Sequence, residues 1–332
     1  MSELRYNLIS GEWIILATER AKRPKDFVKI KKEQVSLPEY KENCPFCPGN
    51  ESQTPLETFR LGDTNSWKVR SVYNKFGAVS NEEKKERRIS GLYNSMNGFG
   101  MHEVIIEHPQ HNKCIPLMTC EEVENILKVY KSRYLAISKI QGIECIVIFK
   151  NHGPAAGTSL EHPHSQLIAI PVVPPQIRGR LERAASFFDF NGKCVFCTML
   201  ESELKEKTRI VLETEHFVAF MPYAAFTPFV TWIFPRRHSV SFSDINNEEI
   251  SDLAKNLKTT LSKLYYGLDN PDFNYSIRSI PVGERGLDYF HWYISVIPRL
   301  SQPAGFELGS GMFINTALPE TAAEFLRQVT PA

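Results

Sequence analysis

The sequence predicts an α+β protein of two domains, each with a mainly antiparallel sheet and one long helix. Three patterns occur in the same order in both halves of the chain: a Cys-x-Phe-Cys motif, an amphipathic helix, and an apolar strand that carries a histidine and ends at proline. Several strands with one helix between them, instead of a regular alternation, favour antiparallel sheets. We expect a first domain over residues 1–175 and a second over residues 176–332, because a proline-rich stretch begins at residue 171.

The elements of the first half can be assigned in order. Residues 103–107 form an apolar strand, and His111 follows it. Thr119 and Glu122 have the spacing of a capping box, and the apolar residues after them recur at helical spacing. The strand of residues 162–171 closes this half and carries two histidines.

The second half repeats this plan. Residues 230–235 form an apolar strand, and His238 follows it. A helix is expected to begin near Asn246, and its apolar face would carry Ile250, Leu253, Leu257, Leu261 and Leu264. The closing strand contains His291 and ends at Pro298.

Composition and charge exclude several classes of protein. The chain has 332 residues, of which 42% are hydrophobic and 23% charged, as in globular proteins. The formal net charge of +1 offers no basis for binding nucleic acid or a membrane surface. No apolar run is long enough to span a bilayer, and residues 1–5 lack the apolar core of a signal peptide. We therefore expect a cytoplasmic protein with no nucleic-acid or membrane partner.

Four of the 7 cysteines form two Cys-x-x-Cys pairs. In a reducing compartment such pairs more often bind metal or do redox work than form structural bridges, although a merely buried pair is also possible. Two thiolates need two further ligands to complete a tetrahedral zinc site, and histidines follow each pair in parallel order. We expect two structural Zn²⁺ sites, one of Cys44, Cys47, His111 and His162 and the other of Cys194, Cys197, His238 and His291. The distances between the pairs are too long for a zinc ribbon, which weakens a nucleic-acid-binding interpretation.

His162 and His164 are one residue apart on a strand, so both side chains point to the same face. Two histidines side by side contribute little to an apolar core. The pair makes sense if one is held in place by a ligand and the other acts as a nucleophile. A neutral imidazole, with a pKa of ~6.5, is a competent nucleophile near neutral pH. The sequence therefore favours a metal-bound His162 and a catalytic His164.

The His-x-His-x-Gln segment ending at Gln166, after Asn151-x-Gly-x-x-x-Gly157, resembles the active-site strand of the galactose-1-phosphate uridylyltransferase family. That family is a branch of the histidine-triad superfamily and is built of two tandem histidine-triad-like domains. Nearly the whole chain is covered, because further family motifs match in order: Tyr6-Asn7, Gly11-x-Trp13-Ile14, Arg20 to Pro24, Cys44-x-x-Cys47-x-Gly49-Asn50, Arg70-x-x-x-Asn74 and His111.

The resemblance implies a reaction. In the family, the residue at His164 attacks the α-phosphorus of a nucleoside diphosphate sugar, and a sugar 1-phosphate leaves. A second phosphate, free or on a sugar, then takes the nucleotide from the histidine in a ping-pong cycle. Hydrolytic members of the superfamily carry a third histidine where this chain has Gln166. An amide can bind a phosphoryl oxygen but cannot shuttle protons, so Gln166 favours transfer over hydrolysis.

The resemblance also implies ligand-binding residues. Arg20 and Arg23 look like phosphate contacts, and a guanidinium suits that task. The other expected substrate contacts are Asn74, Asn151, Gly157, Ser159 and Glu307. The two zinc sites resemble the family's own site and a second one found in some members. Family members are often dimers, which is the ground for expecting a homodimer.

The C-terminal tail departs from the best-known members of the family. Their hexose-contacting tract contains a lysine and a glutamine that this chain lacks, whereas Glu307 is kept. The tail resembles a second branch, which includes bacterial proteins named uridylyltransferases and a plant enzyme that transfers adenylyl groups from ADP-glucose to phosphate.

Three functions remain at this point. We favour uridylyl transfer between UDP-glucose and a hexose 1-phosphate such as galactose 1-phosphate, in galactose metabolism. The alternative is adenylyl transfer from ADP-glucose or another adenylylated donor to phosphate. A third and remote hypothesis is a non-catalytic zinc-bearing nucleotide-binding protein. Such a protein would have no need of His164 together with Gln166.

Overall fold

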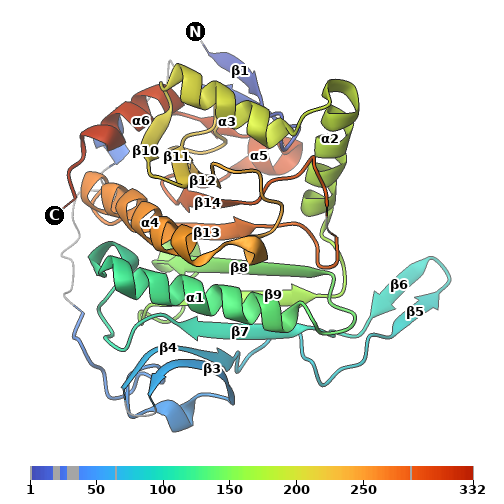
Figure 1. Ribbon diagram of the computed structural model, residues 1–332, viewed down its shortest axis with the longest axis vertical. Coiled ribbons are helices and arrows are strands. Elements are labelled where there is room, and N and C mark those ends of the chain that lie inside the picture. The colour runs from blue at the N-terminus through green and yellow to red at the C-terminus, as the bar shows by residue number, and fades with distance from the viewer. Residues whose placement is uncertain (1, 18–22, 28–36, 64–65, 285, 332) are drawn as a thin grey trace.

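The computed structural model of the protein describes residues 2–17, 23–27, 37–63, 66–284 and 286–331 (Figure 1). Its centre is a 10-stranded sheet in which every neighbouring pair of strands is antiparallel. From one edge to the other the strands are β10 (Ile210–Glu213), β11 (Phe217–Phe220), β12 (Thr231–Pro235), β14 (Tyr293–Pro298), β13 (Phe273–Arg278), β8 (Cys145–His152), β9 (His164–Ile170), β7 (Met101–Ile106), β4 (Ser66–Tyr73) and β3 (Glu57–Asp63).

The order of the strands confirms the α+β class and the two tandem units. From each edge to the middle the chain order is the same: β3-β4-β7-β9-β8 in the first half and β10-β11-β12-β14-β13 in the second. The halves meet where β8 pairs with β13, with Asn151 opposite Asn274 and Ile148 opposite Ile277. We expected a separate sheet in each unit, but the two sheets are joined into one. Joining them pairs two strand edges that would otherwise leave backbone N–H and C=O groups unpaired.

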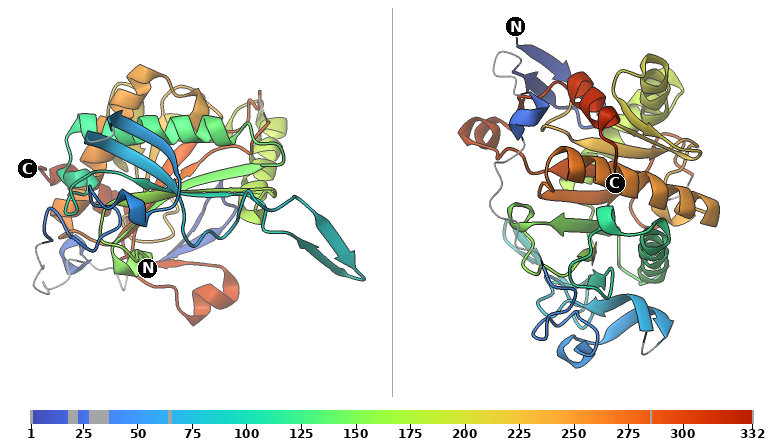
Figure 2. Two further views of the ribbon diagram at one scale, coloured as in Figure 1. Left: turned by 90° about the horizontal axis from the view of Figure 1, so that it is seen from below. Right: turned by 90° about the vertical axis from the view of Figure 1, so that its left-hand side faces the viewer.

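Two long helices cover one face of this sheet. Helix α1 (Cys120–Ile137) and helix α4 (Asn247–Gly267) lie side by side over the middle strands (Figures 1 and 2). Both begin with the capping boxes that the sequence predicts, at Thr119 and Asn246. Their apolar faces form one core with the strands beneath them, which includes Leu127, Tyr130, Leu257, Leu261, Leu167 and Ile294.

The opposite face of the sheet is covered differently in the two halves. In the first half it packs against the loop that contains Cys44, Phe46 and Cys47. In the second half it packs against α3 (Val195–Glu206), and α2 (Pro175–Asn191) lies beside α3. The remaining helices are α5 (Gly305–Ser310), α6 (Pro319–Gln328) and the short 3-10 helices η2 (Pro24–Phe27), η3 (Glu51–Gln53), η4 (Ile115–Leu117), η5 (Pro154–Ala156) and η6 (Phe242–Asp244).

The N-terminal hairpin packs on the second half of the molecule. Strands β1 (Glu3–Tyr6) and β2 (Trp13–Leu16) form a small sheet with β15 (Ile314–Asn315) near the C-terminus. Arg5 forms an ion pair with Glu320 of α6 at 2.8 Å. The N-terminal residues therefore pack against the second half of the molecule, although they belong to the first half of the sequence. The division at residues 175 and 176 stays a prediction, and the structure has α2 beginning there.

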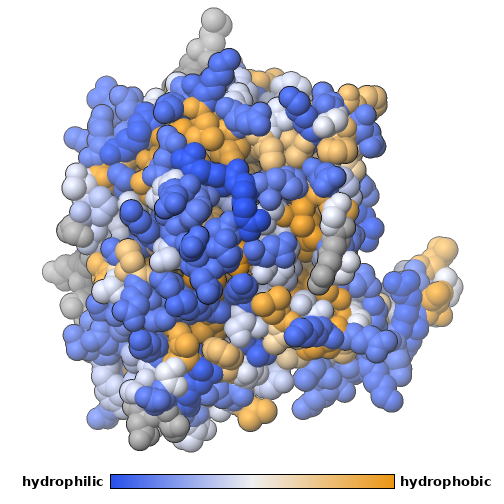
Figure 3. Space-filling model, viewed as in Figure 1, coloured by the Kyte–Doolittle hydropathy of each residue, from blue (hydrophilic) through white to orange (hydrophobic). Residues whose placement is uncertain are grey.

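A second hairpin, β5 (Arg87–Ser90) and β6 (Tyr93–Met96), projects from the body of the molecule (Figures 1 and 2). Leu92 at its turn is 93% exposed. The face of the molecule seen in Figure 3 is largely hydrophilic. Its apolar patches include one at the tip of this hairpin and one near α3. Among the described residues, no helix is both long and apolar enough to cross a membrane.

Candidate functional site

Strand β9 begins at His164 and lies between β7 and β8 in the middle of the first half. His162 and His164 share one face, as the sequence predicts. It is the face opposite α1 and α4, because Leu167 and Ala169, at the alternate positions of β9, pack in the core beneath those helices. The ring of Phe46 contacts both, with centroids 6.0 Å from His162 and 5.6 Å from His164. The two histidines have different neighbours beyond Phe46, and this difference separates their roles.

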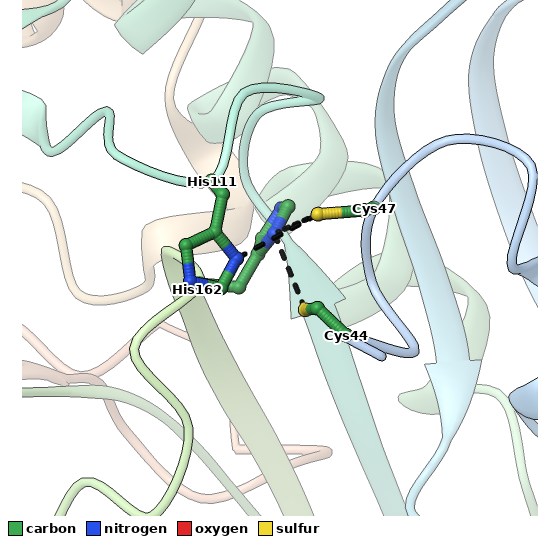
Figure 4. A group of neighbouring side chains, drawn as sticks. All are labelled: Cys44, Cys47, His111 and His162. Atoms are coloured by element: carbon green, nitrogen blue, oxygen red, sulfur yellow. Dashed lines mark hydrogen bonds between the residues drawn. The ribbon is translucent and has the colours of Figure 1, made fainter. Parts of the chain in front are cut away.

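His162 belongs to a buried group of four side chains from three segments: Cys44, Cys47, His111 and His162 (Figure 4). Their candidate ligand atoms all lie within 4.8 Å of one another. The sulfur of Cys47 is 3.6 Å from Nδ1 of His111 and 3.6 Å from Nδ1 of His162. The structure thus groups all four residues that the sequence assigned to the first metal site.

The hydrogen bonds of His162 fit a metal ligand. Its Nε2 lies 2.7 Å from the carbonyl oxygen of His108, which can only accept, so the proton is on Nε2. Nδ1 then presents its lone pair to the sulfurs, as a ligand to a metal does. Burial lowers the pKa of His162 to about 3, which keeps the imidazole neutral. Two thiolates and two neutral imidazoles are a donor set that suits a tetrahedral zinc ion.

The second group brings together three of the four residues assigned to the second metal site. Cys194, Cys197 and His238 have candidate ligand atoms within 4.8 Å of one another, and Nδ1 of His238 is 3.3 Å from the sulfur of Cys197. His291 lies outside this group, although its ring centroid is 5.7 Å from that of His238. Nδ1 of His291 donates to the carbonyl oxygen of Trp292 at 2.8 Å. Its Nε2 is buried without a hydrogen-bond partner among the described residues and is the nitrogen left for a metal.

His164 has one nitrogen engaged and one free. Nδ1 donates to the carbonyl oxygen of His162 at 2.8 Å, so Nε2 carries the lone pair of the neutral ring. Burial lowers the pKa of His164, which favours this neutral form. From the helix side, Lys150 donates to the carbonyl oxygen of His164 at 3.1 Å and forms a buried ion pair with Glu107. Tyr130 of α1 donates to the same carboxylate at 3.2 Å.

His164 and Gln166 line a cavity of about 880 Å³. Its other walls are the loop of residues 45–55, the end of β4 with residues 74–76, and the β7 side chains His102 and Val104. Pockets that bind small molecules in proteins typically measure about 300–1,000 Å³. The cavity is therefore large enough for a nucleotide.

The amide of Gln166 is oriented by two neighbours that line the same cavity. The backbone N–H of Ala78 donates to Nδ1 of His102 at 3.0 Å, which puts the ring proton on Nε2. That Nε2 donates to Oε1 of Gln166 at 2.8 Å, and Asn74 offers a second donor to the same oxygen at 3.5 Å. The amide nitrogen of Gln166 is then the end of the side chain left for a ligand.

Two of the other predicted substrate contacts line this cavity, and two do not. Asn74 and Ser159 line it. Asn151 and Gly157 do not line it. Asn151 is on β8, where its Oδ1 accepts a hydrogen bond from Asn274 of β13 at 2.8 Å. Gly157 has φ 87°, a conformation that suits glycine, and it ends η5.

Two further predicted contacts, Arg23 and Glu307, do not line the cavity. Arg20 lies outside the described residues. Arg23 is exposed and precedes η2, whose Phe27 packs on Phe229 of the second half with ring centroids 5.7 Å apart. Glu307 is in α5, where its carboxylate accepts from the backbone N–H of Ala304 at 3.0 Å. Their roles stay predictions.

Sequence reasoning missed four residues of this region: Phe46, His102, Glu107 and Lys150. His102 could have been found, because it is two residues before Val104 on the same face of an expected strand. Glu107 and Lys150 could not, since a charged residue at the end of an apolar strand is ordinarily exposed. Only the packing of α1 onto the sheet shows that these two groups are buried together.

Models of one family match the two halves. The N-terminal domain of galactose-1-phosphate uridyl transferase matches residues 1–174, and the C-terminal domain matches residues 181–330. The chain belongs to the galactose-1-phosphate uridyl transferase family. The resemblance read from the motifs of the sequence is thereby confirmed.

Individual members of the galactose-1-phosphate uridyl transferase family match over nearly the full length. ADP-glucose phosphorylase of Arabidopsis thaliana is 38% identical over 99% of this chain and 93% of its own. Galactose-1-phosphate uridylyltransferase of Thermotoga maritima is 31% identical over 99% of this chain and 98% of its own. The crystal structure of the Arabidopsis phosphorylase with bound ADP-glucose superposes with a TM-score of 0.84, 33% identity and 99% of both chains covered. A uridylyltransferase structure gives a TM-score of 0.77 and 27% identity, with 98% of this chain and 97% of that chain covered.

Proposed function

We propose that this member of the family is a nucleotidyltransferase that works through a covalent nucleotidyl-His164 intermediate in a ping-pong cycle. One observation carries the proposal. Nδ1 of His164 is held by the carbonyl oxygen of His162 at 2.8 Å, which leaves the Nε2 lone pair in a cavity of about 880 Å³. A buried, neutral and oriented imidazole is the form of histidine that attacks phosphorus.

The transfer of the nucleotidyl group to His164 needs no strong acid or base. Nε2 of His164 forms a bond to the α-phosphorus of a nucleoside diphosphate sugar, and the bond from that phosphorus to the bridging oxygen breaks. The electron pair stays on the oxygen of the departing sugar 1-phosphate, which is an anion already. The ring gains positive charge as the bond forms, and the carbonyl oxygen that accepts from Nδ1 of His164 stabilises it. Attack by an acceptor phosphate on the same phosphorus reverses these changes.

Gln166 binds the phosphoryl group in this proposal. Its carbonyl end accepts from His102 at 2.8 Å, so its N–H₂ end donates to a nonbridging oxygen. An amide cannot remove a proton from water, so the intermediate lasts until a phosphate arrives. This arrangement supports transfer in preference to hydrolysis.

For the donor we propose an adenylylated sugar such as ADP-glucose, with phosphate as the acceptor. This reverses the order of the two alternatives that the sequence left open. Identity to the Arabidopsis ADP-glucose phosphorylase is 38%, against 31% to the Thermotoga uridylyltransferase over a similar span. The tail around Glu307 also lacks the lysine and glutamine of the hexose-contacting tract. Uridylyl transfer from UDP-glucose to galactose 1-phosphate stays the second candidate, favoured by the 31% identity over 98% of the Thermotoga protein.

We further propose that the two Cys/His groups hold structural Zn²⁺. Bound zinc would neutralise two thiolates and tie the loop of residues 44–47 to the start of β9, which fixes His164. At the second site His291 would complete the set through its unpartnered Nε2. A cytoplasmic location and a homodimer stay predictions.

Intact mass spectrometry tests the central proposal. Wild-type protein replete with zinc is mixed with ADP-glucose or with UDP-glucose, and the chain is weighed. We expect an added adenylyl group with ADP-glucose, no adduct in His164→Asn, and an adduct in the control His216→Asn, which changes a partly exposed histidine of the second half. A uridylyl adduct alone would restore the uridylyl assignment. No adduct with either donor, or an adduct in His164→Asn, would overturn the covalent intermediate.

A further inference from the structure

A second cavity, of about 430 Å³, lies on the same face of the sheet in the second half of the molecule. Its walls are residues 7–12 of the N-terminal hairpin, the first turns of α2, and side chains of β12, β13 and β14. Its volume falls within the usual range of small-molecule sites, which is about 300–1,000 Å³. Nothing in the proposed reaction uses it.

This cavity occupies the position in the second half that the candidate active site occupies in the first. Strand β14 lies between β12 and β13 as β9 lies between β7 and β8. Alignment of His162 with His291, the equivalent metal-site histidines, gives these equivalent pairs: His164 with Tyr293, Gln166 with Ser295, and Val104 with Trp232. All six residues line their respective cavities. The second cavity therefore has the same place in its half as the candidate active site, with Tyr293 in place of the histidine.

Three arginines line the second cavity: Arg180 and Arg183 of α2 and Arg278 of β13. Nη1 of Arg180 and Nε of Arg278 are buried and have no hydrogen-bond partner among the described residues. Burial and the neighbouring charge of Arg180 lower the pKa of Arg278. A buried guanidinium nitrogen without a partner is costly, and an anion in the cavity would offset that cost. Among the described residues that line the cavity, Glu12 is the single carboxylate, and it is exposed.

The far side of the cavity is aromatic. Trp232 is on β12, two strands away from Arg278 on β13, and two strand spacings are about 10 Å. Phe226 and Phe313 also line the cavity, with ring centroids 5.4 Å apart. A basic side and an aromatic side, on strands about 10 Å apart, suit the two ends of a nucleotide, a phosphate and a base.

We propose that the second cavity binds a nucleotide, with the phosphate on Arg180 and Arg278 and the base against the aromatic side. Tyr293 stands where the first half has the proposed nucleophile, so the nucleotide is bound there and not transferred. The site is distinct from the catalytic one, and its occupancy does not depend on a covalent intermediate.

Equilibrium dialysis with radiolabelled AMP and with UMP tests this proposal. A nucleoside monophosphate has no sugar phosphate to release, so it reports binding without transfer. We expect two AMP molecules per wild-type chain and one in Arg278→Met and in Arg180→Met. The control Arg178→Met, which changes an exposed arginine of α2 outside the cavity, should keep two. Two equivalents in both cavity variants, or a single equivalent in wild type that both cavity variants keep, would overturn the proposal.

A measurement on the unaltered protein guards against misfolded variants. Phenylglyoxal modifies accessible arginines, and peptide mass spectrometry gives the rate at each one. Saturating AMP should slow the modification of Arg180 and Arg278 at least fivefold and leave Arg178 unchanged. Equal rates with and without AMP would show that no nucleotide occupies the cavity, whatever the outcome of the adduct experiment at His164. Protection by inorganic phosphate that equals the protection by AMP would reduce the site to a phosphate site and remove the role given to the aromatic side.

Discussion

In the first half of the sheet the cavity is lined by His164 and Gln166, whereas the equivalent positions of the second half carry Tyr293 and Ser295. The strand order is the same on both sides. The two halves therefore share one backbone arrangement, and a few side chains decide which half can form a bond to phosphorus. Function depends on the site that a fold carries and not on the fold itself. Here two copies of one fold in a single chain carry different side chains at the equivalent site.

The two halves also differ beneath the nucleophile strand. In the first half, Lys150 and Glu107 form a buried ion pair under His164. The equivalent positions of the second half, by strand register, are Ile277 and Pro235, which are apolar and buried. A buried charge pair costs desolvation, so its presence in only one half is explained by a task other than folding. We infer that it holds the backbone of His164 in place.

The largest expected difference between the halves is catalytic. His164→Ala should lower nucleotidyl transfer by about 10⁴-fold or more, because no other group replaces a removed nucleophile. Tyr293→Phe, the matched change in the second half, should alter the transfer rate less than about twofold, which corresponds to under ~0.5 kcal/mol. Steady-state assays with ADP-glucose and phosphate measure both. Comparable losses in the two variants would mean that the second half takes part in the chemistry.

The metal groups should differ in what they contribute to stability. Cys47→Ser breaks a buried group of four residues, and loss of a structural metal can cost about 4 kcal/mol or more. Cys197→Ser should cost less, because His238 is exposed, whereas all four residues of the first group are buried. Zinc content and thermal unfolding, measured together, test this order. An equal or larger loss of stability in Cys197→Ser would contradict this order.

The buried ion pair can be tested against its apolar counterparts. Lys150→Met leaves the carboxylate of Glu107 buried without its partner, and such a break typically costs about 3–5 kcal/mol. The double variant Lys150→Met with Glu107→Leu restores the apolar character of the second half and should regain most of that stability. Its transfer rate should stay low, because His164 has lost the donor to its carbonyl oxygen. Chemical denaturation and activity assays on all three proteins separate the two roles, and a double variant with full activity would remove the positioning role.

Most of the fold and the first metal group could be predicted because they depend on local patterns. The capping boxes at Thr119 and Asn246 begin α1 and α4 as expected, and the four residues of the first group lie together. The strand histidines were informative for a further reason. A two-residue spacing fixes the face of a strand whatever the rest of the fold does.

What could not be predicted depends on contacts between distant segments. Two sheets become one because β8 and β13 pair across the halves, and no pattern within either strand specifies its partner. The N-terminal hairpin joins β15 near the C-terminus, so the chain order gives no guide to its place. Arg23 and Glu307 match family motifs, yet neither lines the cavity of a single chain. Motif matching gives a residue type and leaves its position to the tertiary structure.

The smallest predicted effect concerns His102, whose equivalent in the second half by strand register is Val230. His102→Val removes the donor that holds Oε1 of Gln166, and we expect about a tenfold loss in kcat, or ~1.4 kcal/mol, with little change in KM. If His102 acts through Gln166, the double variant His102→Val with Gln166→Ala should be no slower than Gln166→Ala alone. Independent losses that multiply would instead mean that His102 contacts the substrate itself. His102→Asn, which can still donate from its amide, should recover part of the lost rate, because the task of the residue is to present a proton to the carbonyl end of Gln166.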